Sequence, residues 1–155
     1  MSQERKKVFI VGGGWMGVML GQALEKSSRK AKGGGLFDVT IIDKKKAFYN
    51  NVMGLQACVE PDIVNTMLAP KDKTLKEGRT IHAEIESVLP IDSEHPKPRI
   101  KLKARIDTLE ADIVVVATGT EYSFPGKVPW WIGTGACVRM YEKISSEVQK
   151  AESIT

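Results

Sequence analysis

The fold of this chain is decided by Val8 to Gly17 (VFIVGGGWMG), an apolar run that leads straight into a glycine-rich turn. Gly12, Gly14 and Gly17 have the spacing G-x-G-x-x-G, and a helical pattern follows at once. A short buried strand, such a turn and a helix are the elements that open a dinucleotide-binding βαβ unit. We therefore expect this loop to bind a dinucleotide. The alternative interpretation is an ordinary glycine-rich turn.

Each glycine of the motif has a physical role in this interpretation. Gly12 permits the tight bend, Gly14 lets the backbone approach a pyrophosphate, and Gly17 lets the helix pack closely on the sheet. The helix N-terminus presents unpaired N–H groups and the positive end of its dipole to the phosphates. The predicted cofactor contacts in the loop are Gly12, Gly13, Gly14, Trp15, Met16 and Gly17.

A second strand is predicted over residues 37–43 (FDVTIID), and it ends in an acidic residue. In dinucleotide-binding folds a carboxylate at this place accepts hydrogen bonds from the adenosine ribose. Asp43 comes somewhat later after the glycines than the usual spacing of about 20 residues. The polar, glycine-containing connector 27–35 accounts for the excess. The alternative for Asp43 is a simple turn residue at the end of a strand.

The rest of the chain predicts an α/β, Rossmann-like fold with a parallel sheet and a small antiparallel excursion. Strands predicted over residues 80–89 and 100–104 form the excursion. The fully apolar run Ile113 to Ala117 predicts a buried parallel strand. The predicted helices are 18–26, 134–152 and a short one that opens at Pro61.

Composition limits the classes of function. The chain has 155 residues and a formal net charge of +4, and its lysines are not interleaved with aromatic residues, so we expect one domain and no nucleic-acid partner. Its two cysteines, Cys58 and Cys137, are far apart in the sequence and form no C-x-x-C pair. This usage argues against a disulfide framework and a metal site and fits a reducing compartment. We expect a cytoplasmic protein.

A third motif adds a family resemblance. Residues 112–120 (DIVVVATGT) resemble the Ala-Thr-Gly motif of flavoproteins with two dinucleotide-binding domains. That group includes type II NADH dehydrogenases, apoptosis-inducing factors and pyridine nucleotide-disulfide oxidoreductases. Residues 43–60 and 124–127 resemble the apoptosis-inducing factor family, in particular its ferroptosis suppressor branch. The likeness extends from about Lys7 to Glu152.

The resemblance implies FAD as the cofactor, with its pyrophosphate at the glycine loop and its adenosine ribose at Asp43. It places the backbone of Ile85 at the adenine edge. In such enzymes the flavin takes hydride from NAD(P)H and passes electrons to a quinone-like acceptor, so no catalytic side chain is expected. The resemblance also implies peripheral membrane contact. The further cofactor contacts that it implies are Lys44, Ala117, Thr118 and Gly119.

The chain departs from the family pattern in several places. Met16 replaces a glycine, Gln56 stands where a basic residue is usual, and the absence of a cysteine pair near Cys58 excludes the disulfide-reductase branch. No second glycine loop follows, so the chain by itself is not expected to hold an NAD(P)H site. We expect residues 7–152 to be the FAD/NAD(P)-binding domain of a larger oxidoreductase, in truncated form. Two alternatives stay open: an NAD-binding Rossmann dehydrogenase and a non-catalytic nucleotide-binding fragment.

Overall fold

The computed structural model describes residues 4–31 and 35–153 and divides into two compact units. The first comprises Met1–Lys46 and Lys71–Gly119, and the second comprises Ala47–Pro70 and Thr120–Thr155. The elements in chain order are β1 (Lys6–Val11), α1 (Trp15–Lys30), β2 (Phe37–Asp43), β3 (Ala47–Tyr49), η1 (Asn51–Met53), α2 (Gly54–Ala57), η2 (Pro61–Ile63), α3 (Val64–Met67), β4 (Leu68–Pro70), η3 (Lys71–Lys73), β5 (Arg79–His82), β6 (Ile85–Leu89), β7 (Arg99–Leu102), β8 (Thr108–Glu110), β9 (Ile113–Val116) and α4 (Thr134–Lys150).

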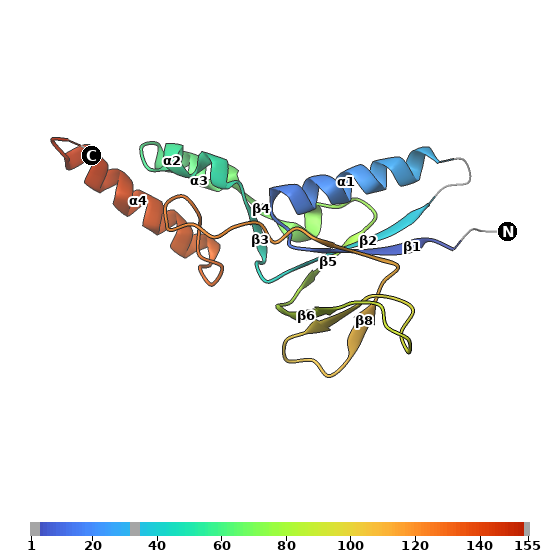
Figure 1. Cartoon of the computed structure of the whole chain (residues 1–155). Helices are drawn as coiled ribbons and strands as arrows, with labels where there is room; N and C mark the ends of the chain where they lie inside the picture. Colours follow the sequence, from blue (N-terminus) through green and yellow to red (C-terminus); the bar gives the residue numbers. More distant parts are fainter. Residues whose placement is uncertain (1–3, 32–34, 154–155) are drawn as a thin grey trace. The chain divides into compact units, whose positions relative to one another are not determined.

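The first unit is built on a four-stranded parallel sheet with the strand order β5-β2-β1-β9 (Figure 1). In the register of its two central strands, Ile10 of β1 lies opposite Ile41 of β2. Both side chains face α1, because a Cβ on Gly21 of that helix would lie 3.4 Å from Ile41 and 3.6 Å from Ile10. The glycine therefore lets α1 pack closely on one face of the sheet.

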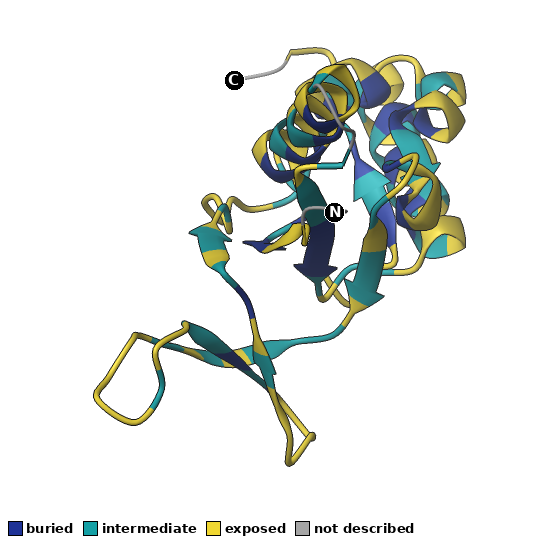
Figure 2. Cartoon of the chain, turned by 90° about the vertical axis from the view of Figure 1, so that its right-hand side faces the viewer, coloured by how far each residue is buried: buried dark blue, intermediate teal, exposed yellow. Residues whose placement is uncertain are grey.

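A three-stranded antiparallel sheet, β6-β7-β8, covers the other face of the parallel sheet. Side chains alternate along a strand, so Phe9 and Val11 of β1 point away from α1. They join Ile100 and Leu102 of β7 in one buried cluster. The loops between the antiparallel strands are exposed (Figure 2). The predicted α/β architecture, with a parallel sheet and a small antiparallel excursion, is confirmed.

Two strand predictions were wrong in detail. The strand expected over residues 80–89 is two strands, β5 and β6. Pairing with β2 ends at Ala83, whose N–H donates to the carbonyl of Asp43 at 3.0 Å. The chain then enters the antiparallel sheet, where β6 begins at Ile85. The run Ile113 to Ala117 forms β9, but this is an edge strand rather than a buried one. Ile113 is 40% exposed and Val116 is 62% exposed. Apolar composition predicts the strand, whereas burial depends on what lies beside it.

The helix predictions hold with shifted ends. The first helix continues through residues 27–30, which the sequence assigns to a connector. Ser28 is buried there, and its hydroxyl oxygen accepts a hydrogen bond from the Phe37 N–H at 3.2 Å. Part of the expected connector, residues 32–34, lies outside the described residues. The late helix is confirmed as α4, and the short helix at Pro61 is confirmed as η2 followed by α3.

The second unit has its own apolar core. The short strands β3 and β4 pair antiparallel, and sequence patterns did not predict them. The buried residues of this core are Ala47, Tyr49, Ala57, Cys58, Val64, Met67, Val128, Cys137 and Tyr141. Cys58 is buried as a small side chain, and its thiol donates to the carbonyl of Gly54 at 3.3 Å. Across both units, no helix among the described residues is long and apolar enough to cross a membrane.

Candidate functional site

The glycine loop lies between β1 and α1, where its backbone touches two other strand ends. Gly12 has φ of +105°, a conformation that L side chains rarely adopt, and its N–H donates to the carbonyl of Ile42 at 2.8 Å. A Cβ here would lie 2.5 Å from the carbonyl oxygen of Ala117. Glycine at position 12 is therefore required both by backbone conformation and by the segment after β9.

The other two motif glycines serve different purposes. A Cβ on Gly17 would collide with the backbone oxygen of Gly12, so only glycine lets α1 start this close to the loop. A Cβ on Gly14 would meet no atom within 4 Å. Gly14 is the N-cap of α1, which has no side-chain cap and no acidic residue in its first turn. The positive end of the helix therefore borders open space that could admit an anionic group.

Asp43 at the end of β2 is tied to the glycine loop. Its Oδ2 accepts the N–H of Gly13 at 2.5 Å, and its Oδ1 accepts the N–H of Lys45 at 2.6 Å. The turn that follows is held from β5, where the Nε2 of His82 lies 2.6 Å from the carbonyl oxygen of Lys44. These bonds bring the predicted ribose-binding carboxylate against the predicted phosphate-binding loop.

Sequence patterns missed the residue that completes this cluster. The Nζ of Lys71 lies 2.7 Å from Asp43 Oδ1, and Lys71 is only 3% exposed. Burial lowers the pKa of this lysine, although the neighbouring carboxylate opposes the shift. Lys71 stands in the run KDKTLK, residues 71–76, and nothing in that pattern distinguishes it from Lys73 or Lys76. Only the fold reveals its burial.

Of the remaining predicted contacts, Ala117 and Thr118 lie at the glycine loop, whereas Ile85 lies in the antiparallel sheet. Ala117 donates its N–H to the carbonyl of Val11 at 2.7 Å, and with Thr118 it lies against Gly12. Ile85 lies at the start of β6, where it pairs with Leu102. The exposed members of the predicted set are Gly14, Trp15, Met16, Lys44, Thr118 and Gly119. The structure thus brings Gly12, Gly13, Asp43, Ala117 and Thr118 together.

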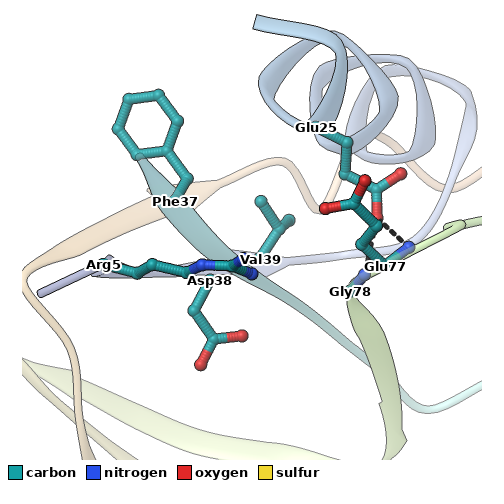
Figure 3. A pocket seen from close by; sticks show the side chains of 7 residues that line it. All are labelled: Arg5, Glu25, Phe37, Asp38, Val39, Glu77 and Gly78. Carbon is teal, nitrogen blue, oxygen red and sulfur yellow. Dashed lines mark hydrogen bonds between the residues drawn. The ribbon is translucent and has the colours of Figure 1, made fainter. Parts of the chain in front are cut away.

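A small pocket elsewhere in the first unit has a structural explanation (Figure 3). There Glu25 reaches from α1 and accepts the N–H groups of Lys76, Glu77 and Gly78 at 3.0, 2.8 and 2.6 Å. Burial by itself would raise the pKa of Glu25, but the three backbone hydrogen bonds and the nearby charge of Arg29 together lower it. Glu25 therefore anchors the segment before β5 to α1.

Comparison with known proteins adds a family context, although no family model matches the chain. The chain is 29% identical over 152 residues to apoptosis-inducing factor homolog A of Dictyostelium discoideum, covering 97% of this chain and 33% of the relative. It is 28% identical over 156 residues to ferroptosis suppressor protein 1 of Xenopus laevis, covering 98% and 37%. The resemblance to apoptosis-inducing factor-like proteins is confirmed. The chain spans about a third of the length of these relatives.

Solved structures show the same fold. A sulfide:quinone oxidoreductase from Aquifex aeolicus matches with a TM-score of 0.67 at 15% identity, covering 94% of this chain and 33% of that one. NDH2 from Plasmodium falciparum, solved in complex with NADH, matches with a TM-score of 0.54 at 17% identity, covering 98% and 31%. The chain therefore has the fold of one region in each of these larger proteins.

Proposed function

We propose that the first unit binds FAD and is the FAD-binding module of an NAD(P)H:quinone-type oxidoreductase. The observation that carries this proposal is the meeting of the glycine loop, Asp43 and the Ala117 segment at the carboxyl ends of β1, β2 and β9. Open parallel α/β sheets bind their ligands at this edge. The choice of a flavin rests on the family resemblance of the sequence motifs, and the similarity to apoptosis-inducing factor homologs and ferroptosis suppressor protein 1 supports that resemblance.

The residues present fit such a dinucleotide. The open space beside Gly14 and the uncapped start of α1 suit a diphosphate, which backbone N–H groups and the helix dipole would hold. Asp43 would accept a hydrogen bond from the adenosine ribose. Ile85 would meet the adenine edge, and the segment 117–119 would close over the cofactor. The flanking contacts in this proposal are Gly12, Gly13, Trp15, Met16, Gly17 and Lys44.

When bound, the flavin would supply hydride acceptance from NAD(P)H and electron transfer to a quinone-like acceptor. The side chains of this chain would bind and orient the cofactor rather than react. We further propose that the first unit acts as part of an FAD/NAD(P)-binding domain, residues 7–152, of a larger oxidoreductase. Cysteine usage supports a cytoplasmic location, and the family resemblance supports peripheral membrane contact.

Flavin retention by the purified chain tests the proposal. The chain is loaded with FAD, desalted, and examined for visible flavin absorbance, which we expect to remain with the protein. Gly14→Val should abolish retention with little change in folding, because its side chain would enter the open space that the diphosphate needs. Loss of all flavin from the unmodified chain would contradict the proposal.

Gly133→Val is the matched control. Gly133 is the N-cap of α4, has an extended backbone like Gly14, and a Cβ there would also meet no atom within 4 Å. Both substitutions therefore carry the same cost of valine at an N-cap. Only Gly14→Val should release flavin. Preferential retention of NADH over FAD would instead favour a nicotinamide dinucleotide site.

A further inference from the structure

The ion pair between Lys71 and Asp43 is the most unusual interaction of the first unit. Its two side chains are 4% and 12% exposed, and the Nζ-to-Oδ1 distance is 2.7 Å. Lysine is almost never fully buried, and removing two charges from water carries a large desolvation penalty that their mutual attraction must offset. A pair held this deeply at a strand end needs a reason beyond stability.

The ammonium lies directly behind the glycine loop. A Cβ on Gly13 would be 3.1 Å from Lys71 Nζ and 3.0 Å from the Ile41 side chain. The backbone of Lys71 is fixed as well, because its carbonyl accepts the N–H of Thr74 at 3.1 Å and the hydroxyls of Thr74 and Thr80 at 2.6 and 3.2 Å. Lys71 therefore reaches the loop from a rigid base.

The hydrogen bonds of Asp43 leave one acceptor position of its carboxylate open. Each carboxylate oxygen can accept about two hydrogen bonds. Oδ1 of Asp43 receives both Lys45 N–H and Lys71 Nζ, whereas Oδ2 receives the Gly13 N–H. One acceptor position is left, and it lies on Oδ2, the oxygen bonded to the loop. Lys71 also offsets the negative charge of Asp43, which would otherwise repel a diphosphate at the same loop.

We propose that Lys71 is a positioning residue of the nucleotide site, which orients Asp43 toward a ribose hydroxyl and balances its charge beneath the diphosphate. The inference rests on the proposed function. The ligand feature that it selects is a nucleoside diphosphate with a free 2′-hydroxyl. Lys71 does not touch the ligand and acts only through Asp43 and Gly13.

The test compares FAD, ADP and 2′-deoxy-ADP by calorimetry on the whole chain. The unmodified protein should prefer ADP over 2′-deoxy-ADP by about tenfold, the size of one hydrogen bond to a charged group. In Lys71→Met the carboxylate of Asp43 is free to turn and its charge is unbalanced. This variant should therefore bind ADP and 2′-deoxy-ADP about equally, and its affinity for FAD should fall at least tenfold. A purely structural lysine would weaken both ADP ligands equally and keep their ratio.

Two further variants make the result decisive. Lys101→Met removes an exposed lysine that pairs with Glu86 at 2.9 Å in the same unit, and it should bind all three ligands like the unmodified chain. Lys71→Gln keeps a donor for Asp43 without the charge, so it should retain the preference for the 2′-hydroxyl while FAD weakens severalfold. If circular dichroism shows that Lys71→Met is unfolded, Lys71→Gln decides through the charge: FAD and ADP should bind severalfold more weakly while uncharged adenosine does not, and equal weakening of all three overturns the role of Lys71.

The possible failures are separable. If the unmodified chain binds FAD but does not prefer ADP over 2′-deoxy-ADP, the role of Lys71 is overturned and the proposed function stays intact. The same holds if both Lys71 variants keep that preference and bind FAD as tightly as the unmodified chain. Binding of neither FAD nor ADP by the unmodified chain overturns both.

Discussion

The two units of the molecule differ in whether their buried polar groups, among the described residues, include charged side chains. The first unit buries charges: Asp43 with Lys71, and Glu25 with three backbone N–H groups. The second unit buries neutral donors instead. Tyr49 donates to the carbonyl of Ile132 at 3.0 Å, and Tyr141 donates to that of Pro125 at 3.1 Å.

This difference predicts that the first unit responds to pH and ligand more strongly than the second. Buried charges cost much desolvation and depend on every partner, whereas a buried hydroxyl needs one acceptor. Burial raises the pKa of Tyr141 to about 12, so this hydroxyl stays neutral at all physiological pH values. We therefore expect changes in pH and ligand to act on the first unit and leave the second unit unchanged.

The largest expected effect concerns how closely α1 starts to the glycine loop. Gly17→Ala should lower the free energy of unfolding of the first unit by about 4 kcal/mol, because the added Cβ collides with the Gly12 carbonyl oxygen. Amide exchange resolved by residue would show lost protection in β1 and β2. Gly135→Ala is the control, since its Cβ meets only Arg139 at 3.7 Å in α4 and alanine favours the helix. Equal protection in both variants would contradict the steric argument.

The next effect concerns the buried charge of Glu25. Glu25→Gln should destabilise the first unit by about 2 kcal/mol at pH 7, because an amide cannot accept all three backbone N–H groups as well as a carboxylate does. Chemical denaturation measures the change. Glu86→Gln, at an exposed ion pair with Lys101, should leave stability nearly unchanged. A similar loss in both variants would show that the three backbone bonds do not matter.

The same carboxylate predicts the pH response. The pKa of Glu25 is lower in the folded chain than its ordinary value of 4.5, so its contribution is fully present above about pH 4.5 and is lost as pH falls through the folded pKa. Amide protection of residues 76–78 should therefore fall in acid before that of the second-unit core. This early loss should vanish in Glu25→Gln. Simultaneous loss of protection in both units would show that Glu25 does not control the response to acid.

A smaller effect is expected in the neutral core. Tyr141→Phe should cost about 1 kcal/mol, the net worth of one hydrogen bond to a carbonyl, and the cost should not change between pH 5 and about pH 9. Thermal unfolding at several pH values measures this. Tyr122→Phe is the control, because Tyr122 is largely exposed. A cost that varied with pH would show that the second unit also depends on a buried charge.

Much of the first unit follows from local sequence. The strand β1, the glycine turn and the helix α1 are predicted because the apolar run, the glycines and the helical periodicity are all contained within about one βαβ half. The end of β2 at Asp43 is likewise a local pattern. These features need no knowledge of distant residues. The contact of Asp43 with Gly13 joins two predicted segments and confirms that they meet.

Other features depend on residues that are distant in sequence. The division of residues 80–89 into β5 and β6 follows from pairing with β2 and β7, and the exposure of β9 follows from its place at the sheet edge. The burial of Lys71 follows from the arrangement of Asp43, Gly13 and Ile41 around it. The strand, glycine turn and helix of the predicted nucleotide-binding motif can be inferred from the sequence, because turn chemistry and periodicity are local. Only the tertiary structure decided which of several similar lysines lies beneath the loop, because burial is set by neighbours that the chain supplies from elsewhere.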